Sequence, residues 1–240
     1  MDFCAVILAA GEGKRMNSTL PKVLHKCNGK ELVLHITEAL ENVGINDICV
    51  IVGHDETEQA CKKYALRRQY EKLGTGHAAA QGIDYFKNYK NVMVLCGDTP
   101  LLTPQLLAEL KKSHLESGSK ATLISVVLDN AYGYGRIIRN KSGQVVKITE
   151  QKDADEEQQK INEINASVYC FDSEFLTNSL SKIKPNNKQG EYYLTDVIGI
   201  ACAQGEKINS VIAKDHNEVL GINTLEQLAE AELIMKVRKN

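Results

Sequence analysis

Two glycines and two cationic side chains follow the first apolar stretch of the sequence, and together they could bind a polyphosphate. Gly11 and Gly13 end the apolar stretch, and Arg15 and Lys22 come next. Glycines let a backbone approach phosphate oxygens closely because they carry no Cβ atom. Arginine and lysine can neutralise the charge that develops during phosphoryl or nucleotidyl transfer. Pro21 restricts the backbone before Lys22, which favours a fixed direction for this side chain.

The spacing of the glycines argues against two common phosphate-binding loops. The sequence contains no GxxxxGK[ST] segment, so this is not a Walker loop. The dinucleotide-binding fingerprint would need a third glycine at the position of Met16, which disfavours a NAD-dependent oxidoreductase. A simple glycine turn after a buried strand remains the alternative for the two glycines taken alone.

The carboxylate of Asp98 follows another apolar stretch, which spans positions 91–96. If this stretch is a strand of a parallel sheet, Asp98 lies near its carboxyl end, where α/β sheets bind ligands. A carboxylate beside a triphosphate is repelled unless a cation lies between them, and Mg²⁺ prefers such oxygen ligands. A turn or helix-cap role is the alternative for Asp98 alone.

Eight short motifs follow one another along nearly the whole chain. They are LAAGEGKRMNSTLPKVLH (8–25), LGTGHA (73–78), CGDTPL (96–101), GYGRI (133–137), EQKDA (150–154), EIN (163–165), GEYYLTD (190–196) and GIN (221–223). In type and order these motifs resemble those of the bacterial N-acetylglucosamine-1-phosphate uridylyltransferases. We therefore use this family to form expectations about fold, reaction and site.

The resemblance implies an enzyme that transfers UMP from UTP to N-acetylglucosamine 1-phosphate, with Mg²⁺ as cofactor, and releases pyrophosphate. The sugar phosphate is itself an anionic nucleophile, so a direct in-line attack needs no covalent enzyme intermediate. The implied architecture is α/β, the nucleotide-diphospho-sugar transferase fold. It has a Rossmann-like mixed, mainly parallel sheet flanked by helices, and a small β-rich sugar-binding lobe.

The resemblance also implies roles for single residues. Lys22 would bridge the α-phosphate and the sugar phosphate, and Arg15 would hold the β- and γ-phosphates. Asp98 and Asn223 would bind Mg²⁺, so that Arg15, Lys22 and Asp98 form the catalytic set. For Asn223 alone, the N-cap of the last helix is the alternative.

The remaining implied contacts are with the nucleotide and the sugar. The nucleotide-binding residues would be Leu8, Ala10, Gly11, Gly13, Lys22, Gln69, Gly74 and Thr75. The sugar-binding residues would be Gly135, Glu150, Asn165 and Thr195. An amide side chain and backbone groups can complement the acceptor–donor–acceptor edge of uracil. His77 is expected to pack or cap its helix, because an anionic nucleophile needs no general base.

Four positions depart from the motifs of the resembled family. Lys14 replaces a threonine, Cys96 a tyrosine and Ser167 a glycine, and Thr224 follows Asn223 in place of asparagine or aspartate. Ser167 leaves the exact sugar open, so another sugar 1-phosphate, or dTTP as nucleotide, is the alternative. A non-catalytic sugar-nucleotide-binding regulator is the alternative of a different class. It is disfavoured because a pure binder needs neither Lys22 nor both metal ligands.

Composition limits the partners and the compartment. The 240 residues include 29 Lys and Arg against 31 Asp and Glu, a net charge of −2, which disfavours a nucleic-acid-coating role. No apolar run approaches the ~18 residues of a membrane span, so we expect no membrane partner. The seven cysteines form no CxxC pair. A reducing, cytoplasmic compartment is the simplest expectation.

The apolar pattern predicts strands that alternate with helices, as in a parallel sheet with right-handed crossovers. Strands are predicted at 3–9, 47–52, 91–96, 121–128 and 164–171, with a hairpin of strands 135–139 and 144–149 around a turn at 140–143. Helices are predicted at 31–42, 55–64, from 75, at 105–117 behind Pro104 and at 224–239, and the charged segment 153–160 is expected to be a solvated helix or loop.

We expect a single nucleotidyltransferase domain over residues 1–240. Its nucleotide-binding lobe would span about 1–120, its sugar-binding lobe about 121–222 and its C-terminal helix about 224–239. The sequence shows no hexapeptide repeats, so the acetyltransferase domain of bifunctional family members is not expected. The oligomeric state stays open, with a monomer slightly favoured.

Overall fold

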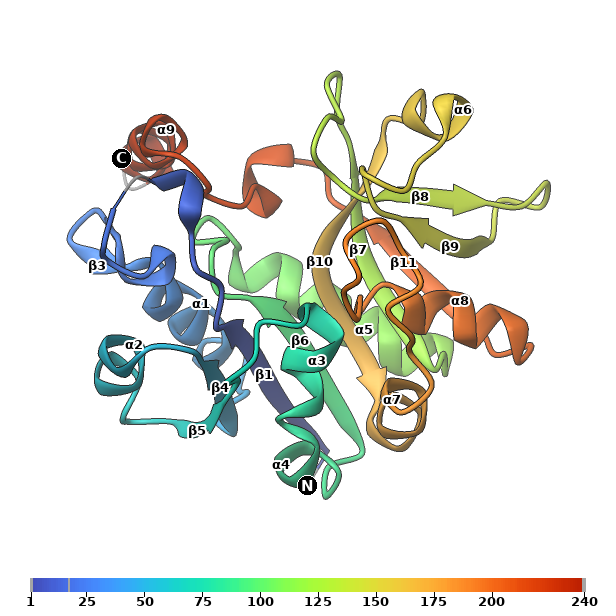
Figure 1. Ribbon diagram of the computed structural model, residues 1–240, viewed down its shortest axis with the longest axis horizontal. Helices are drawn as coiled ribbons and strands as arrows, with labels where there is room; N and C mark the ends of the chain where they lie inside the picture. Colours follow the sequence, from blue (N-terminus) through green and yellow to red (C-terminus); the bar gives the residue numbers. More distant parts are fainter. Residues whose placement is uncertain (1, 17, 239–240) are drawn as a thin grey trace.

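One mixed sheet runs through the molecule and carries helices on both faces (Figure 1). The computed structural model describes residues 2–16 and 18–238, except for the side chain of Lys14. A role for the Lys14 side chain and the predicted helix end at Lys239 therefore lie outside the described residues. Within them, the strands of the large sheet are β1 (Phe3–Ala9), β4 (Ile48–Val52), β5 (Ala65–Arg68), β6 (Asn91–Cys96), β7 (Ala121–Val127), β8 (Arg136–Arg139), β9 (Val145–Thr149), β10 (Glu163–Asp172) and β11 (Ile208–Ile212).

The strand order is β11-β7-β10-β6-β1-β4-β5, and the β8–β9 hairpin joins through β10. The central strands β4, β1 and β6 are parallel to one another. Within β1, Ala5, Ile7 and Ala9 pack toward one face of the sheet, and Cys4 and Val6 pack toward the other. Burial on both faces explains why these strands are continuously apolar rather than alternating. Their carboxyl ends meet at one edge of the sheet.

Helices cover both faces of this sheet. The apolar cluster on one face includes α1 (Leu32–Glu41) and α5 (Pro104–Ser117). The cluster on the other face includes α3 (Thr75–Ala80), α4 (Ile83–Phe86), α7 (Ser173–Leu180) and α8 (Asp196–Ala203). Two short helices remain: α2 (Asp55–Ala60) follows β4, and α6 (Glu156–Gln159) follows the hairpin.

The last helix packs beside the segment that follows β1. A two-stranded ribbon of β2 (Lys26–Cys27) and β3 (Lys30–Glu31) lies against α9 (Leu225–Arg238). Met16, Cys27, Ile222 and Ala231 share one small apolar cluster there. Figure 1 shows α9 next to this ribbon, at the side of the molecule away from the β8–β9 hairpin. The packing brings the first 30 residues of the chain together with its last described residues.

Most predicted elements are found close to their expected positions. The strands at 3–9 and 91–96 match β1 and β6 at both ends, and Pro104 is the first residue of α5. The helix predicted at 55–64 is too long, because α2 ends at Ala60 and β5 begins at Ala65. The sequence patterns missed β5, β11, α7 and α8. Both strands are only half-buried for most of their length, so their apolar signal is weak.

The predicted mixed, mainly parallel sheet is confirmed, and its antiparallel part includes β10. β10 runs antiparallel to both β6 and β7. The predicted lobe boundary near residue 120 falls inside the sheet, since β7, β10 and β11 extend the strands of the first half. The hairpin packs against α8 and projects from this sheet (Figure 1). Among the described residues, no helix has the length and apolar character needed to cross a bilayer.

Candidate nucleotide and sugar site

The carboxyl ends of β1 and β6 contribute to a cavity of about 350 Å³. It is lined by Leu8, Ala10, Gly11, Arg15, Lys22, Val23, Gln69, Lys72, Gly74, Thr75, Ala78, Cys96, Gly97, Asp98 and Asn223. Of the residues expected at the nucleotide, the phosphates and the metal, this set contains every one except Gly13. We call this space the nucleotide cavity.

Two cations and two oxygen-bearing side chains meet in the nucleotide cavity. The Lys22 ammonium donates to Asp98 Oδ2 and, at 3.0 Å, to Asn223 Oδ1. Arg15 Nη2 donates to the same Asn223 oxygen at 2.8 Å. The side chains of Lys22 and Asp98 are 15% and 17% exposed, so solvent screens their attraction less than at an open surface. Segments far apart in the sequence thus bring two cations, a carboxylate and an amide oxygen together.

Local packing holds Lys22 in this position. Pro21 precedes it with φ −51°, and Val23 and Leu24, which follow it in a single 3₁₀ turn, are buried. A Cβ atom on Gly13 would lie 2.5 Å from the Lys22 Cβ, and Gly13 has a φ of +63°. Both features require glycine. Gly13, expected to touch the nucleotide, therefore contributes by letting Lys22 pack closely.

Asn223 is presented by the start of α9. Thr224, rather than Asn223, caps this helix, because its Oγ1 accepts from the Gln227 backbone N–H at 3.3 Å. The Ile222 N–H donates to the Asp98 carbonyl at 2.8 Å, which ties the segment before α9 to the segment after β6. The amide oxygen of Asn223 is therefore available to Lys22 and Arg15.

Another part of the cavity wall combines Gln69 with the loop before α3. Gln69 directly follows β5, its backbone N–H donates to Val52 at 2.9 Å, and it is 4% exposed. Its Nε2 donates to the Gly74 carbonyl at 3.1 Å. A Cβ atom on Gly74 would lie 2.6 Å from the Tyr192 carbonyl oxygen. Thr75 Oγ1 accepts from a backbone N–H two residues after Tyr192, at 3.0 Å. This loop therefore joins the two halves of the chain.

A second cavity, of about 190 Å³, shares Leu8, Thr75 and Cys96 with the first. The remaining residues that line it are mostly polar: Glu150, Ser167, Tyr169, Gln189, Glu191, Tyr193, Leu194 and Thr195. We call it the sugar cavity, since hydroxyl, amide and carboxylate groups suit a polar, hydroxyl-rich ligand. The shared residues make the two cavities neighbours across one wall.

Glu150 and Thr195, both expected at the sugar, line this cavity together. Thr195 donates its hydroxyl to Glu150 Oε1 at 2.9 Å. Burial raises the pKa of Glu150 above its usual value, although this hydrogen bond acts in the opposite direction. The carboxylate is thus held inside the protein with one oxygen engaged.

Gly135 and Asn165, also expected at the sugar, do not line the cavity. Asn165 Nδ2 donates to the Tyr169 hydroxyl at 2.6 Å, and its Oδ1 accepts from the Ser167 N–H at 3.2 Å. The Gly135 carbonyl accepts from the Asn165 N–H at 2.9 Å. A Cβ atom on Gly135 would lie 3.4 Å from Glu150 Oε2. Asn165 and Gly135 therefore contact residues whose side chains do line the cavity, namely Tyr169, Ser167 and Glu150.

Ser167 lies at an irregularity of β10. The register of β10 against β7 shifts between Asn165 and Tyr169, and Ser167 has a φ of +56°. Among the described residues other than glycine, only Asn28 shares a positive φ. This conformation is strained for serine, and such strain is common beside binding sites. It turns a residue of a central strand toward the sugar cavity.

Cys96 lines both the nucleotide cavity and the sugar cavity. Burial, reinforced by the nearby negative charge of Asp98, raises the pKa of its thiol to about 12. A thiol with this pKa stays protonated near neutral pH, and the thiolate is the reactive form. The Cys96 thiol is therefore poorly suited to act as a nucleophile at neutral pH.

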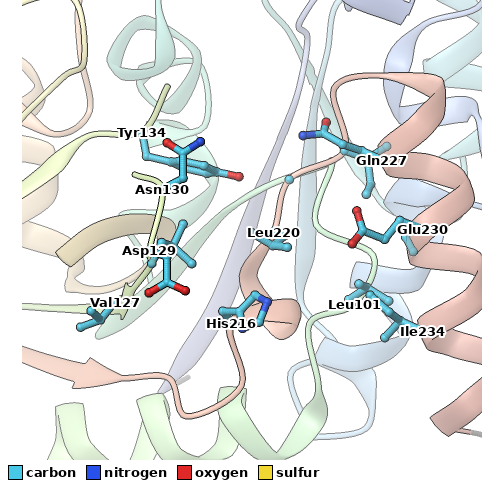
Figure 2. Close-up of a pocket in the computed structure, with 14 residues that line it drawn as sticks. Leu101, Val127, Asp129, Asn130, Tyr134, His216, Leu220, Gln227, Glu230 and Ile234 are labelled. Atoms are coloured by element: carbon cyan, nitrogen blue, oxygen red, sulfur yellow. The ribbon is translucent and has the colours of Figure 1, made fainter. Parts of the chain in front are cut away.

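A third cavity, also of about 350 Å³, lies between the segment after β7 and α9 (Figure 2). Figure 2 shows Asp129 and Tyr134 on one side of it and Glu230 on the other, with His216 between them. No lysine or arginine lines it among the described residues. A polyanion would therefore meet two carboxylates and no fixed cation, so the nucleotide cavity is the better phosphate site.

Several residues of the site were missed in the sequence. Lys72 lines the nucleotide cavity, where its ammonium donates to the Gln69 carbonyl at 3.1 Å and burial lowers its pKa. It directly precedes the motif at 73–78, which could have drawn attention to it. Glu191 and Tyr193 lie in the motif of Thr195 and line the sugar cavity. Their motif was recognised, but only Thr195 was selected from it.

The chain is similar to a known family of domains and to several curated proteins. Residues 5–146 match the family model of the MobA-like NTP transferase domain. The bifunctional protein GlmU of Clostridium beijerinckii is 46% identical over 99% of this chain and 53% of that protein. The protein of the same name from Clostridioides difficile is 42% identical over 100% of this chain and 53% of that protein. The chain thus spans about half the length of these curated relatives.

A solved structure shows the same fold. The UDP-glucose pyrophosphorylase complexed with UDP-glucose superposes with a TM-score of 0.78 and covers 99% of this chain and 100% of that chain. The two are 16% identical, so the similarity concerns the fold. The nucleotide-diphospho-sugar transferase fold implied by the motifs is thereby confirmed. Since the family model covers more than half of the sequence, the chain belongs to the family of MobA-like NTP transferase domains.

Proposed function

We propose that this chain is a uridylyltransferase that transfers UMP from UTP to N-acetylglucosamine 1-phosphate and releases pyrophosphate. One observation carries the proposal: Arg15, Lys22, Asp98 and Asn223 meet in a cavity that adjoins a polar sugar cavity. The membership in an NTP transferase family and the name of the relatives support the same reaction class. A non-catalytic regulator would not need the whole charged set.

Asp98 and Asn223 fit a Mg²⁺ ion as the cofactor. Their side-chain oxygens already converge on one cationic group, the ammonium of Lys22. A carboxylate and an amide oxygen are ligands that Mg²⁺ accepts, together with waters and phosphate oxygens. When bound, Mg²⁺ would neutralise phosphate charge and orient the phosphate oxygens.

The cationic side chains of Lys22 and Arg15 would neutralise the remaining phosphate charge. Lys22 would move from its ion pair with Asp98 to lie between the α-phosphate and the sugar phosphate, and so reduce the repulsion between the two anions. Arg15, whose side chain is exposed, would bind the β- and γ-phosphates. Positioning and charge neutralisation are the main requirements of such a transfer.

The base and the sugar would occupy opposite parts of the combined space. Gln69, Gly74 and Thr75 would contact uracil, with the backbone from Leu8 to Gly11 beneath it. Glu150 and Thr195 would bind sugar hydroxyls, with Gly135 and Asn165 supporting them. Ser167 favours a second candidate, the same reaction with another sugar 1-phosphate, because its side chain lines the sugar cavity.

The proposal is tested by supplying purified protein with Mg²⁺, UTP or dTTP, and a panel of sugar 1-phosphates, and by measuring pyrophosphate release. Release with UTP and N-acetylglucosamine 1-phosphate is expected, and chelation of Mg²⁺ with EDTA should abolish it. Release with a different sugar only would select the second candidate. Tight UTP binding without any release would show a binding protein and contradict the proposal.

The proposal extends to the cellular location, the domain organisation and the oligomeric state of the protein. All seven cysteines are free thiols, which is typical of the reducing cytoplasm, and we propose that location. We keep one domain over 1–240 as our description, with its lobes joined by the shared sheet, and a monomer as the expected state. UTP and a sugar 1-phosphate are the proposed partners.

A further inference from the structure

We infer that His77 is a positioning residue that orients the side-chain amide of Gln69, so that the nucleotide cavity accepts uracil and rejects cytosine. The inference rests on the proposed function, because it assumes that a pyrimidine nucleotide binds beside Gln69. It assigns a role to a histidine that the reaction itself does not use.

The orientation of the Gln69 amide is fixed first by the backbone. Its Nε2 lies 3.1 Å from the Gly74 carbonyl oxygen. A carbonyl oxygen only accepts hydrogen bonds, so the amide nitrogen must face it. Gln69 is 4% exposed, and a flipped amide would set two acceptors against each other in a buried place.

His77 takes the second N–H of the same amide. Its Nδ1 lies 3.0 Å from Gln69 Nε2. Since the amide nitrogen is a donor, Nδ1 must offer its lone pair, and a neutral ring then carries its proton on Nε2. The ring also packs against Tyr192 at a centroid distance of 6.4 Å. His77 therefore adds a second constraint on which way the Gln69 amide points.

Gln81 approaches the other ring nitrogen, Nε2, to which it cannot donate when Nε2 carries the ring proton. Its Nε2 lies 3.3 Å from His77 Nε2 and donates to the His77 carbonyl at 3.0 Å. A neutral imidazole has one acceptor nitrogen, so only one of the two amides can donate to the ring. The Gln69 contact is the shorter, and the Gln81 amide already has a carbonyl partner. We therefore assign the acceptor to Nδ1.

The arrangement leaves one polar atom of Gln69 for a ligand. Both N–H groups are used, and its Oε1 has no hydrogen-bond partner among the described residues. Because Gln69 lines the nucleotide cavity, this oxygen is the acceptor available to a base. Uracil carries an N3–H donor, whereas N3 of cytosine is an acceptor. Cytosine would thus leave two acceptors facing each other, which is a strong basis for rejection.

The test compares His77→Leu, which removes the acceptor, with His77→Asn, whose Oδ1 can replace Nδ1. Binding of UTP and of CTP to the full chain is measured by calorimetry with Mg²⁺, and kcat and KM are measured for turnover. Gln81→Met is the matched control, because it removes the amide on the other side of the ring. Thermal unfolding shows whether each variant folds.

Wild-type protein should bind UTP more tightly than CTP. His77→Leu should reduce that preference by about tenfold, the scale of one buried hydrogen bond, here the one between His77 and Gln69. It should also raise the KM for UTP more than it lowers kcat. His77→Asn should restore most of the preference, and Gln81→Met should keep it. A full UTP preference in His77→Leu would overturn the inference.

Failure of the proposed function would look different. Selective UTP binding by the wild type without turnover would contradict the proposed enzymatic function. The role of His77 would then still be decided by the nucleotide preference of the His77 variants. A wild type that binds neither nucleotide would overturn both. The tautomer gives a check that needs no variant: ¹⁵N spectra of histidine-labelled protein should show the Nε2–H form at His77. The Nδ1–H form would contradict the assignment.

Discussion

Lys22 is the residue on which the proposed chemistry depends most. Its ammonium is the group on which Asp98 and Asn223 converge, and its backbone packs against Gly13. We predict that Lys22→Ala lowers kcat by about 10²–10³-fold, or ~3–4 kcal/mol, the cost of losing one positioned donor in the transition state. Lys26→Ala is the matched control, because that lysine is 62% exposed. Near wild-type turnover in Lys22→Ala would refute its role.

Glu150 should make sugar binding sensitive to pH. Burial raises its pKa, so its carboxylate takes up a proton at a higher pH than a solvent-exposed glutamate does. The ionised form accepts hydrogen bonds from sugar hydroxyls, and the KM for the sugar phosphate should therefore increase as the pH falls from 7 to 5. In Glu150→Gln this increase should be smaller, while ionisation of the sugar phosphate affects both proteins equally. Identical pH profiles would argue against the role.

At this scale the sequence predicts the residues of contiguous motifs best. Lys22, Asp98 and Asn223 each lie in such a motif, and the structure brings them together. Asn165, expected at the sugar, does not line the sugar cavity, whereas Ser167, at the register shift of β10, does. A bulge depends on pairing between strands distant in sequence, and no local pattern shows it.

Among the elements, the loop between β5 and α3 connects the two halves of the site. Gly74 has φ +108° and ψ 176°, a conformation open essentially to glycine, and it packs against the Tyr192 backbone. We predict that Gly74→Ala costs about 1–3 kcal/mol of stability and raises the KM of UTP and of the sugar phosphate together. Gly118→Ala is the control, since that glycine also has a positive φ but no atom would lie within 4 Å of its Cβ.

The Gly118→Ala protein should lose about 1–2 kcal/mol of stability through backbone strain, with both KM values unchanged. Denaturant unfolding and steady-state kinetics provide the two readouts. Unchanged KM values in Gly74→Ala would show that the loop does not position the substrates.

The helix α5 is anchored to the sheet by a buried histidine. His114 Nδ1 lies 2.9 Å from Thr122 Oγ1 and its Nε2 lies 3.2 Å from Asn91 Oδ1, and burial lowers its pKa to about 4. The unfolded chain has a histidine pKa near 6.5. The unfolded state therefore binds the proton first, and stability falls as the pH drops from about 6.5 toward 4.

We predict a loss of about 2 kcal/mol between pH 7.5 and pH 5 from this group. His114→Asn keeps a polar side chain that does not titrate in this range, so its stability should vary less over the same interval. Urea unfolding at both pH values measures the difference. Equal losses in the two proteins would show that His114 is not the group responsible.

The central strands of the sheet were predictable from the sequence, and its two edge strands were not. β1, β4 and β6 are buried on both faces, so each appears as an unbroken apolar run. The strands β5 and β11 lie at the two edges of the sheet, where half-buried residues mix polar and apolar types. The antiparallel direction of β10 has no local sequence signal, because direction is set by the path of the whole chain.

For the molecule as a whole, the continuous sheet is what makes one site out of two regions. β6 pairs with β10. Asp98, which follows β6, lines the nucleotide cavity, and Ser167 of β10 lines the sugar cavity. Cys96 lines both. The sequence predicted two lobes facing each other, with the sugar and the nucleotide between them, and this placement of the ligands stays a prediction. It did not predict that the boundary would lie within one sheet, since the pairing of β6 with β10 joins residues more than 70 positions apart.

The central claim is that the nucleotide cavity binds a triphosphate through the residues around Lys22. A crystal structure with UTP and Mg²⁺ tests it most directly. We predict phosphate oxygens within hydrogen-bond distance of Lys22 and Arg15, with a metal ion between them and the oxygens of Asp98 and Asn223. A triphosphate bound instead in the acidic cavity between Asp129 and α9, with Lys22 still paired to Asp98, would contradict the account.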